Sequence, residues 1–291
     1  MKKFVSMLLG LLAAAPMLSC SGDTTPSGRF VVAASFYPVY IIAKNVAAGV
    51  EGAAVVNITP PVTGCLHDYT LTARDMKRLE GANILLVNGA GMENFLGAVA
   101  EKHPSIRVFE LSQGIPMLGG DEGANPHVWV APGNMAAMTR NCARALAQAD
   151  PVNAASYEKN AASYIAEIEA LRKEMHGALD RYRGRPIITF HEAFPYFAAE
   201  FGLKIAAVIE REPGTEPSAK EVADTVDIVR KNKIKALFAE PQYPSSAAKT
   251  IARETGAVVY TLDPAVTGPD DNRAYIDIMR KNLAIIEKAL K

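Results

Sequence analysis

Three of the five histidines in this 291-residue chain stand where predicted secondary-structure elements end. His67 lies on a loop ahead of an amphipathic helix, His127 lies on a turn, and His191 follows an apolar run of strand length. Sites on α/β sheets form at strand ends, and neutral imidazole is a common metal ligand. We therefore expect these three side chains to converge on one metal ion.

Carboxylates near the same element ends could complete such a site. Imidazole with carboxylate is a ligand set for zinc, which prefers four ligands in tetrahedral geometry. Glu240 and Asp263 each follow a predicted strand and precede a proline, so either could be the fourth ligand. Asp68 and Glu192, each adjacent to a histidine, are alternative ligands or acceptors for an imidazole N–H.

Sequence spacing alone does not define this site. The three histidines are separated by 60 and 64 residues, which matches no compact zinc motif. The other two, His103 and His176, fall on surface-type helical segments and are expected to be solvated. Cys142 falls in a predicted helix and is expected to be buried as a small apolar residue. Cys65, two residues before His67, is not expected to bind the metal.

Composition indicates a globular chain long enough for two domains. Hydrophobic residues make up 49% of the chain and charged residues 21%. Lys plus Arg and Asp plus Glu both number 31, so the chain has no excess positive charge to attract nucleic acid. It also contains no basic run, and we expect no nucleic-acid partner.

The first 19 residues have the pattern of an export signal. Two lysines precede a short apolar run, which is too short to span a membrane as a stable helix. The segment Met17-Leu18-Ser19-Cys20 resembles a bacterial lipoprotein box, so we expect lipidation at Cys20. Cleavage of an ordinary signal peptide nearby is the alternative. Residues 20–29 would form a flexible tether, and the exported protein would face the periplasm or the cell exterior as a membrane-anchored lipoprotein.

The remaining chain predicts two α/β lobes joined by one helix. Apolar runs of strand length alternate with helical patterns over residues 30–149 and again over 183–291, which indicates parallel sheets covered by helices. Between them, apolar residues recur at helical spacing through 150–182, a stiff connector of roughly 45 Å at about 1.5 Å per residue. Asp150-Pro151 resembles the start of this helix, and Ser218 with Glu221 predicts a capping box in the second lobe.

Seven motifs, distributed in order over essentially the whole mature chain, resemble the zinc/manganese-binding solute receptors of ABC transporters. They are Ser35-Phe36-Tyr37-Pro38, Gly64–Tyr69, Leu85–Gly91 with Glu93, Asn125–Trp129, His191–Phe194 with Tyr196-Phe197, Glu240-Pro241-Gln242 and Leu262-Asp263-Pro264. The resemblance implies two (β/α)₄ lobes with parallel sheets, joined by one long rigid helix, with the metal in the cleft between the lobes.

The resemblance also implies a ligand set. His67, His127, His191 and Asp263 match the positions of the four ligands, whereas Glu240 matches a residue near the site that is not usually a ligand. The chain departs from the family around His67, where Cys65-Leu66 replaces the common Asp-Pro. It also has no histidine-rich loop between His67 and His127, although a histidine at position 191 favours zinc.

The expected function is capture of Zn²⁺, with Mn²⁺ as the alternative cargo, and its delivery to the permease and ATPase of an ABC transporter. The protein would act as a monomer and would not be an enzyme. Three alternatives stay open at this stage. They are a manganese or iron receptor of the same type, a zinc-dependent hydrolase with an open fourth metal position, and a metal-stabilised adhesin.

Overall fold

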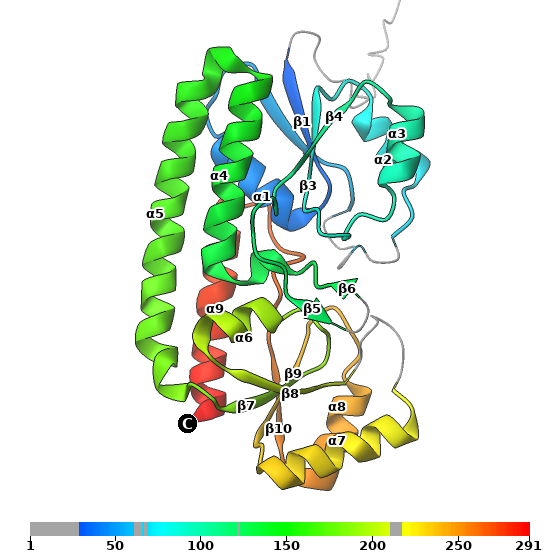
Figure 1. Cartoon of the computed structure of the whole chain (residues 1–291), viewed down its shortest axis with the longest axis vertical. Helices are drawn as coiled ribbons and strands as arrows, with labels where there is room; N and C mark the ends of the chain where they lie inside the picture. The colour runs from blue at the N-terminus through cyan, green and yellow to red at the C-terminus, as the bar shows by residue number, and fades with distance from the viewer. Residues whose placement is uncertain (1–28, 61–65, 67–68, 121–122, 210–216) are drawn as a thin grey trace, which may run out of the picture.

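The computed structural model describes residues 29–60, 66, 69–120, 123–209 and 217–291 (Figure 1). The expectations for Cys20, Cys65, His67 and Asp68 therefore lie outside the described residues. Within them the chain forms two lobes, one above the other, with a pair of long helices along one side (Figure 1). None of the described helices is both long enough and apolar enough to cross a membrane.

The first lobe is built on a four-stranded parallel sheet in the order β2-β1-β3-β4. The two central strands are buried because helices cover both faces of the sheet, as expected for alternating strands and helices. The elements are β1 (Phe30–Ala34), α1 (Tyr37–Val46), β2 (Ala53–Asn57), α2 (Ala73–Leu79), β3 (Ile84–Val87), α3 (Leu96–Lys102) and β4 (Arg107–Glu110).

A pair of helices leads from the first lobe to the second, and the long helix α5 joins the lobes as the sequence predicted. A short hairpin of β5 (Gly119–Gly120) and β6 (Gly123–Ala124), which the sequence did not predict, leads through the 3₁₀ turn η1 (Val128–Val130) into α4 (Pro132–Ala149). The 3₁₀ turn η2 (Pro151–Asn153) then precedes α5 (Ala154–Leu179), which runs beside both lobes and ends in η3 (Asp180–Tyr182) (Figure 1). Asp150 does not cap α5 as predicted. Its carboxylate instead accepts hydrogen bonds from Asn153 and Tyr157, which form the corner between α4 and α5.

The second lobe repeats the strand order of the first. Its sheet runs β10-β9-β7-β8, which is the same connectivity when the strands are counted from the start of the lobe. The predicted capping box at Ser218 and Glu221 is present at the start of α7. The elements are β7 (Pro186–Thr189), α6 (Pro195–Phe201), β8 (Lys204–Val208), α7 (Ala219–Asn232), β9 (Ala236–Ala239), α8 (Ser246–Thr255), β10 (Val258–Thr261) and α9 (Ala274–Leu290).

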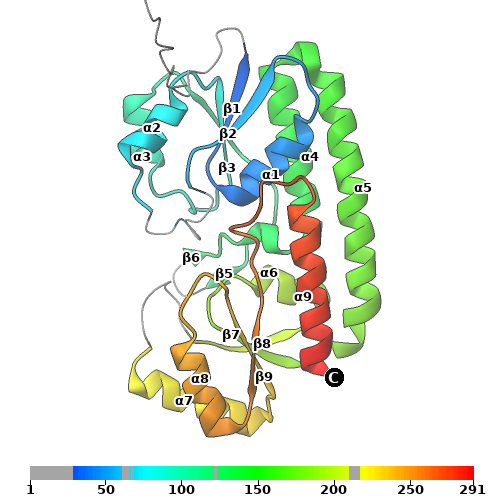
Figure 2. The same ribbon diagram turned by 180° about the vertical axis from the view of Figure 1, so that it is seen from behind.

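One apolar core extends through both lobes. Phe36 and Trp129 belong to the same buried cluster as Phe197, Leu262 and Tyr275 of the second lobe. Cys142, predicted to be buried, has no exposed surface and belongs to this cluster as well. A second, smaller cluster lies between the second sheet and α7 and α8, at the far end of the molecule (Figure 2).

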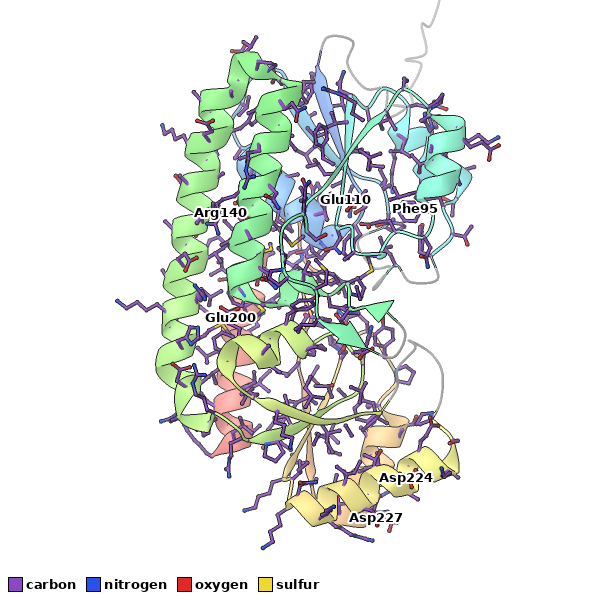
Figure 3. The ribbon with its side chains drawn as sticks, in the orientation of Figure 1. Phe95, Glu110, Arg140, Glu200, Asp224 and Asp227 are labelled. Atoms are coloured by element: carbon purple, nitrogen blue, oxygen red, sulfur yellow. The ribbon has the colours of Figure 1, made fainter. Side chains whose placement is uncertain are left out.

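Polar contacts also join the lobes. The Trp129 indole donates a 2.7 Å hydrogen bond to the Pro264 carbonyl, and the Tyr275 hydroxyl donates a 3.0 Å bond to the Trp129 carbonyl. The Glu200 carboxylate of α6 accepts hydrogen bonds from the Gly133 backbone N–H in α4 and the Arg172 guanidinium in α5 (Figure 3). The boundary between the lobes is therefore packed and hydrogen-bonded like the interior of one domain.

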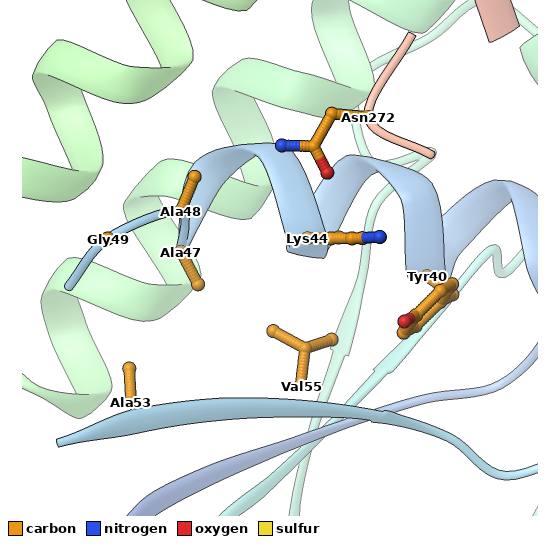
Figure 4. A pocket seen from close by; sticks show the side chains of 8 residues that line it. All are labelled: Tyr40, Lys44, Ala47, Ala48, Gly49, Ala53, Val55 and Asn272. Carbon is orange, nitrogen blue, oxygen red and sulfur yellow. The ribbon is translucent and has the colours of Figure 1, made fainter. Parts of the chain in front are cut away.

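The chain between β10 and α9 lies against α1 of the first lobe. The Tyr37 hydroxyl donates a 2.8 Å hydrogen bond to the Pro269 carbonyl, the Asn45 amide donates to the Asn272 carbonyl, and Lys44 pairs with Asp270. A surface pocket of about 350 Å³ lies beside this contact (Figure 4). Its described lining residues include no imidazole, thiol or carboxylate, so it lacks the chemistry of the predicted metal site.

Candidate metal site

His127 lies at the junction of the lobes, one residue before η1. Only 1% of its surface is exposed. The Asn125 side-chain oxygen accepts the His127 backbone N–H at 3.0 Å and lies 3.1 Å from the ring nitrogen Nδ1. The ring packs beside Trp129 with 5.4 Å between centroids. Backbone and ring are thus both held in place.

His191 approaches His127 from the second lobe. It follows β7 directly after Phe190, at the carboxyl end of a central strand, and is 2% exposed. The two imidazole centroids are 4.7 Å apart and the rings are nearly perpendicular, at 89°. The ring of Tyr243 lies 5.8 Å from that of His191. The fold therefore brings together two of the three predicted imidazole ligands, 64 residues apart in sequence.

Asp263 occupies the turn after β10. Its carboxylate accepts the Ala265 backbone N–H at 2.8 Å, and its own backbone N–H and carbonyl both bond to the Asn282 amide. Ala265 adopts the left-handed conformation with φ of 57°, so this bond stabilises an unfavourable backbone geometry. Burial raises the pKa of Asp263 above its ordinary value, against the opposing effect of the hydrogen bonds that its carboxylate accepts from Ala265 and Gln242. A cation nearby would favour the charged form.

The other predicted carboxylates differ in burial and role. Glu240 directly follows β9 and is buried, with 4% of its surface exposed. Glu192 is partly buried, and its backbone carbonyl accepts a 2.8 Å hydrogen bond from the Asn125 amide. The residue next to His191 is therefore tied directly to the turn that carries His127.

The described residues alone do not complete a metal site. Among them, no group of three or more His, Cys, Asp or Glu side chains is arranged to hold a metal ion. The pair His127–His191 is formed, whereas the hydrogen bonds found for Asp263 involve Ala265, Asn282 and Gln242 and neither imidazole. His67 and Asp68 lie outside the described part of the chain.

A buried carboxylate to which the sequence analysis gave no role lies at the strand ends of the first lobe. Glu93 is 5% exposed and accepts hydrogen bonds from the Ser35 hydroxyl and from the backbone N–H groups of Asn88 and Gly89, at 2.7 to 3.0 Å. Burial nevertheless raises its pKa from 4.5 to about 7. Gly89 has φ of 79°, and a Cβ there would come within 2.8 Å of the Glu110 carboxylate. In the sequence, Glu93 stood out only as a member of the motif Leu85–Gly91 with Glu93, shortly after a strand.

Comparison with known proteins identifies metal-binding transport components as relatives of the chain. Residues 32–289 match the family described as zinc-uptake complex component A, periplasmic. The chain is 30% identical to the zinc-binding lipoprotein AdcA of Streptococcus pneumoniae serotype 4, covering all of this chain but only 61% of that lipoprotein. It is also 30% identical to the iron-binding protein YfeA of Yersinia pestis, covering 87% of this chain and 83% of YfeA.

A solved structure with a similar fold also contains a divalent metal. The solute-binding protein FpvC of Pseudomonas aeruginosa, in complex with Ni²⁺, superposes with a TM-score of 0.81 at 30% identity. The alignment covers 90% of this chain and 97% of FpvC. The likeness extends over both lobes and the helices that join them.

Proposed function

Because the chain belongs to the zinc-uptake complex component A family, we propose that it captures Zn²⁺ outside the inner membrane and delivers it to the permease and ATPase of an ABC transporter. The observation that carries this proposal is the contact between His127 and His191, whose rings meet at 4.7 Å from different lobes. The family consists of solute-binding transport components, so the chain is not an enzyme.

The ligands we propose are His67, His127, His191 and Asp263. Asp263 is linked to the histidine pair through the bond between Trp129, two residues after His127, and Pro264, the residue after Asp263. Two imidazoles and one carboxylate are among the ligands that tetrahedral zinc uses, and His67 would supply the fourth. Glu240, Asp68 and Glu192 would lie around the ligands and hydrogen-bond to their outer atoms.

Zinc is preferred to manganese in this proposal because three of the four ligands are imidazoles. Sites richer in carboxylate suit manganese better. A receptor for iron or manganese is the second candidate, and the similarity to an iron-binding relative favours it. Competition between Zn²⁺ and Mn²⁺ for the metal-free protein, followed with a chromophoric chelator, decides between the two. Preferential binding of Mn²⁺ would reject the zinc assignment.

Membership in a periplasmic family makes the chain an exported protein. We propose that a lipid on Cys20 anchors it to the membrane and that it works as a monomer. Replacement of Cys20 by serine should then release the protein from the membrane fraction. A wild-type protein already found in the soluble fraction would contradict the anchor.

Zinc-dependent stabilisation tests whether the ligands form one site across the lobes. A metal that binds only the folded state stabilises it by RT ln(1 + [L]/Kd), about 4 kcal/mol at a thousandfold excess over Kd. His67→Ala and His191→Ala, at sequence positions assigned to opposite lobes, should each remove most of the zinc-dependent rise in melting temperature. His103→Ala serves as the matched control and should retain it. A full zinc-dependent rise in either ligand variant would show that the metal does not bridge the lobes.

A further inference from the structure

The side chain of Asn125 lies between the two contacting histidine segments and uses both ends of its amide. The Nδ2 group donates a 2.8 Å hydrogen bond to the backbone carbonyl of Glu192 in the second lobe. The Oδ1 atom accepts the His127 backbone N–H and lies 3.1 Å from Nδ1 of the His127 ring. Asn125 is 8% exposed, so water has little access to compete for these bonds.

These contacts determine the protonation of the His127 ring. A carbonyl can only accept hydrogen bonds, so the amide end that faces Glu192 O must be the NH₂ group. The other end, Oδ1, then faces the imidazole, and it too can only accept. The ring nitrogen Nδ1 must therefore carry the proton, which leaves Nε2 with an unprotonated lone pair. A metal ligand needs such a lone pair.

We propose that Asn125 is the positioning residue of the metal site, which holds His127 in the Nδ1–H tautomer, so that Nε2 carries the lone pair that a metal ligand needs. This inference rests on the proposed function, because the tautomer of His127 affects metal binding only if His127 is a metal ligand. It adds a residue that does not touch the metal but sets the orientation and basicity of one that does.

The surrounding contacts fix Asn125 itself from both lobes. Its backbone carbonyl accepts a 2.8 Å hydrogen bond from the Tyr196 hydroxyl of α6, in the second lobe. The next carbonyl along the chain, of Pro126, accepts a 2.9 Å bond from the Asn88 amide at the end of β3, in the first lobe. One side chain thus orients the first-lobe imidazole and fastens the segment beside His191, so it sets the relative position of ligands from opposite lobes.

Two variants of Asn125 and one matched control separate the role in tautomer selection from general cohesion of the lobes. Asn125→Ala removes both amide contacts. Asn125→Asp keeps an acceptor for Nδ1–H, replaces the donor to the Glu192 carbonyl with a carboxylate oxygen and adds a negative charge beside the ring. Asn45→Ala is the control, since the Asn45 amide also donates to a carbonyl of the other lobe, Asn272 O at 3.0 Å, without touching a histidine.

The tautomer is read directly in metal-free protein at pH 8 from the ring ¹⁵N chemical shifts of His127, assigned by comparison with His127→Ala. Wild type and Asn125→Asp should show the Nδ1–H form, and Asn125→Ala should gain the Nε2–H form. Zn²⁺ affinity, measured by competition with a chelator, should fall ~10–100-fold in Asn125→Ala. It should be largely restored in Asn125→Asp and unchanged in Asn45→Ala.

The Nε2–H form in wild-type protein would overturn the inference, and so would an Asn125→Ala variant that binds zinc as tightly as wild type. An equal loss of affinity in Asn45→Ala would also overturn it, because general cohesion of the lobes would then explain the effect. His127→Ala keeps the two proposals apart. If that variant loses zinc binding while Asn125→Ala does not, only the role of Asn125 is wrong, whereas unchanged binding in His127→Ala rejects the metal site itself.

Discussion

The two lobes have the same strand order but use it differently. In the first lobe the central strands β1 and β3 lead into Ser35 and Asn88, which hydrogen-bond to the buried carboxylate of Glu93. In the second lobe the corresponding strands β7 and β9 lead into His191 and Glu240. Equivalent positions of one topology thus carry an internal polar network in one lobe and candidate metal-site residues in the other.

The lobes also differ in how their apolar surfaces are buried. The first lobe shares one core with α4, α5 and α9 and with the inner face of the second lobe. The outer face of the second sheet has a separate core beneath α7 and α8. Movement of one lobe against the other would break a continuous core, whereas α7 and α8 can loosen without breaking it. We therefore expect metal binding to leave the relative position of the lobes largely unchanged.

The largest expected effect comes from a cavity in the shared core. Phe197 of α6 is 1% exposed and packs against Phe194 and Phe201. Phe197→Ala should lower the free energy of unfolding by about 3–5 kcal/mol, the usual cost of removing a buried aromatic ring. Because the core is shared, urea denaturation should still give one transition, and amide exchange should accelerate in both lobes.

The matched variant in the separate core is Ile251→Ala. Ile251 of α8 has no exposed surface and belongs to the cluster beneath α7 and α8. Its replacement should cost about 2–5 kcal/mol locally, with faster amide exchange in α7 and α8 and little change in β1 or β3. If Ile251→Ala accelerated exchange equally in the first lobe, the division into a shared and a separate core would be wrong.

The pH dependence of stability should come from the polar network of the first lobe. The folded state raises the pKa of Glu93 from 4.5 to about 7 and so binds the proton more tightly than the unfolded state does. This contribution is fully present below about pH 4.5 and is lost as the pH rises through 7. At about 1.4 kcal/mol per pKa unit, it amounts to at most roughly 3 kcal/mol.

Glu93→Gln tests this assignment because glutamine has the same shape and does not titrate. Its free energy of unfolding, measured with urea from pH 4.5 to 8, should lack the fall that the wild-type protein shows. The variant Gln242→Glu could not serve in place of Glu93→Gln, because position 242 lies beside the carboxylate of Asp263. A wild-type stability that rises over this interval would contradict the proposed protonation of Glu93.

A smaller effect is expected from one hydrogen bond between the lobes. Trp129→Phe removes the indole donor to the Pro264 carbonyl and should cost about 1–3 kcal/mol, because the carbonyl is left buried without its donor. Zinc affinity should also fall, since Pro264 adjoins Asp263. Tyr275→Phe, which removes the donor to the Trp129 carbonyl, is the control and should lower stability without changing zinc affinity. If Trp129→Phe and Tyr275→Phe bound zinc with equal affinity, Asp263 would not be part of the metal site.

How far the sequence predicted these features depends on the range of the interactions. Alternating strands and helices, the capping box at Ser218 and the burial of Cys142 are local patterns, and the structure confirms them. The contact of His127 with His191 depends on how two distant strand ends meet, so residue spacing could not reveal it. The resemblance to a known family did suggest that contact. Neither pattern nor resemblance identified the bridging role of Asn125, because an asparagine before proline is also a common turn residue.

The smallest effect is expected on the outer surface, where α5 and α9 face each other. Glu174 pairs with Arg280 at 3.2 Å, and seven residues earlier in each segment Glu167 pairs with Arg273, the residue before α9, at 3.1 Å. All four side chains are about half exposed, so water and salt screen their charges. Glu174→Gln should therefore cost less than about 1 kcal/mol, and the difference from wild type should vanish near 1 M salt. A loss above about 2 kcal/mol that persisted in high salt would mean that ion pairs, rather than the shared core, hold α9 and the second lobe in place.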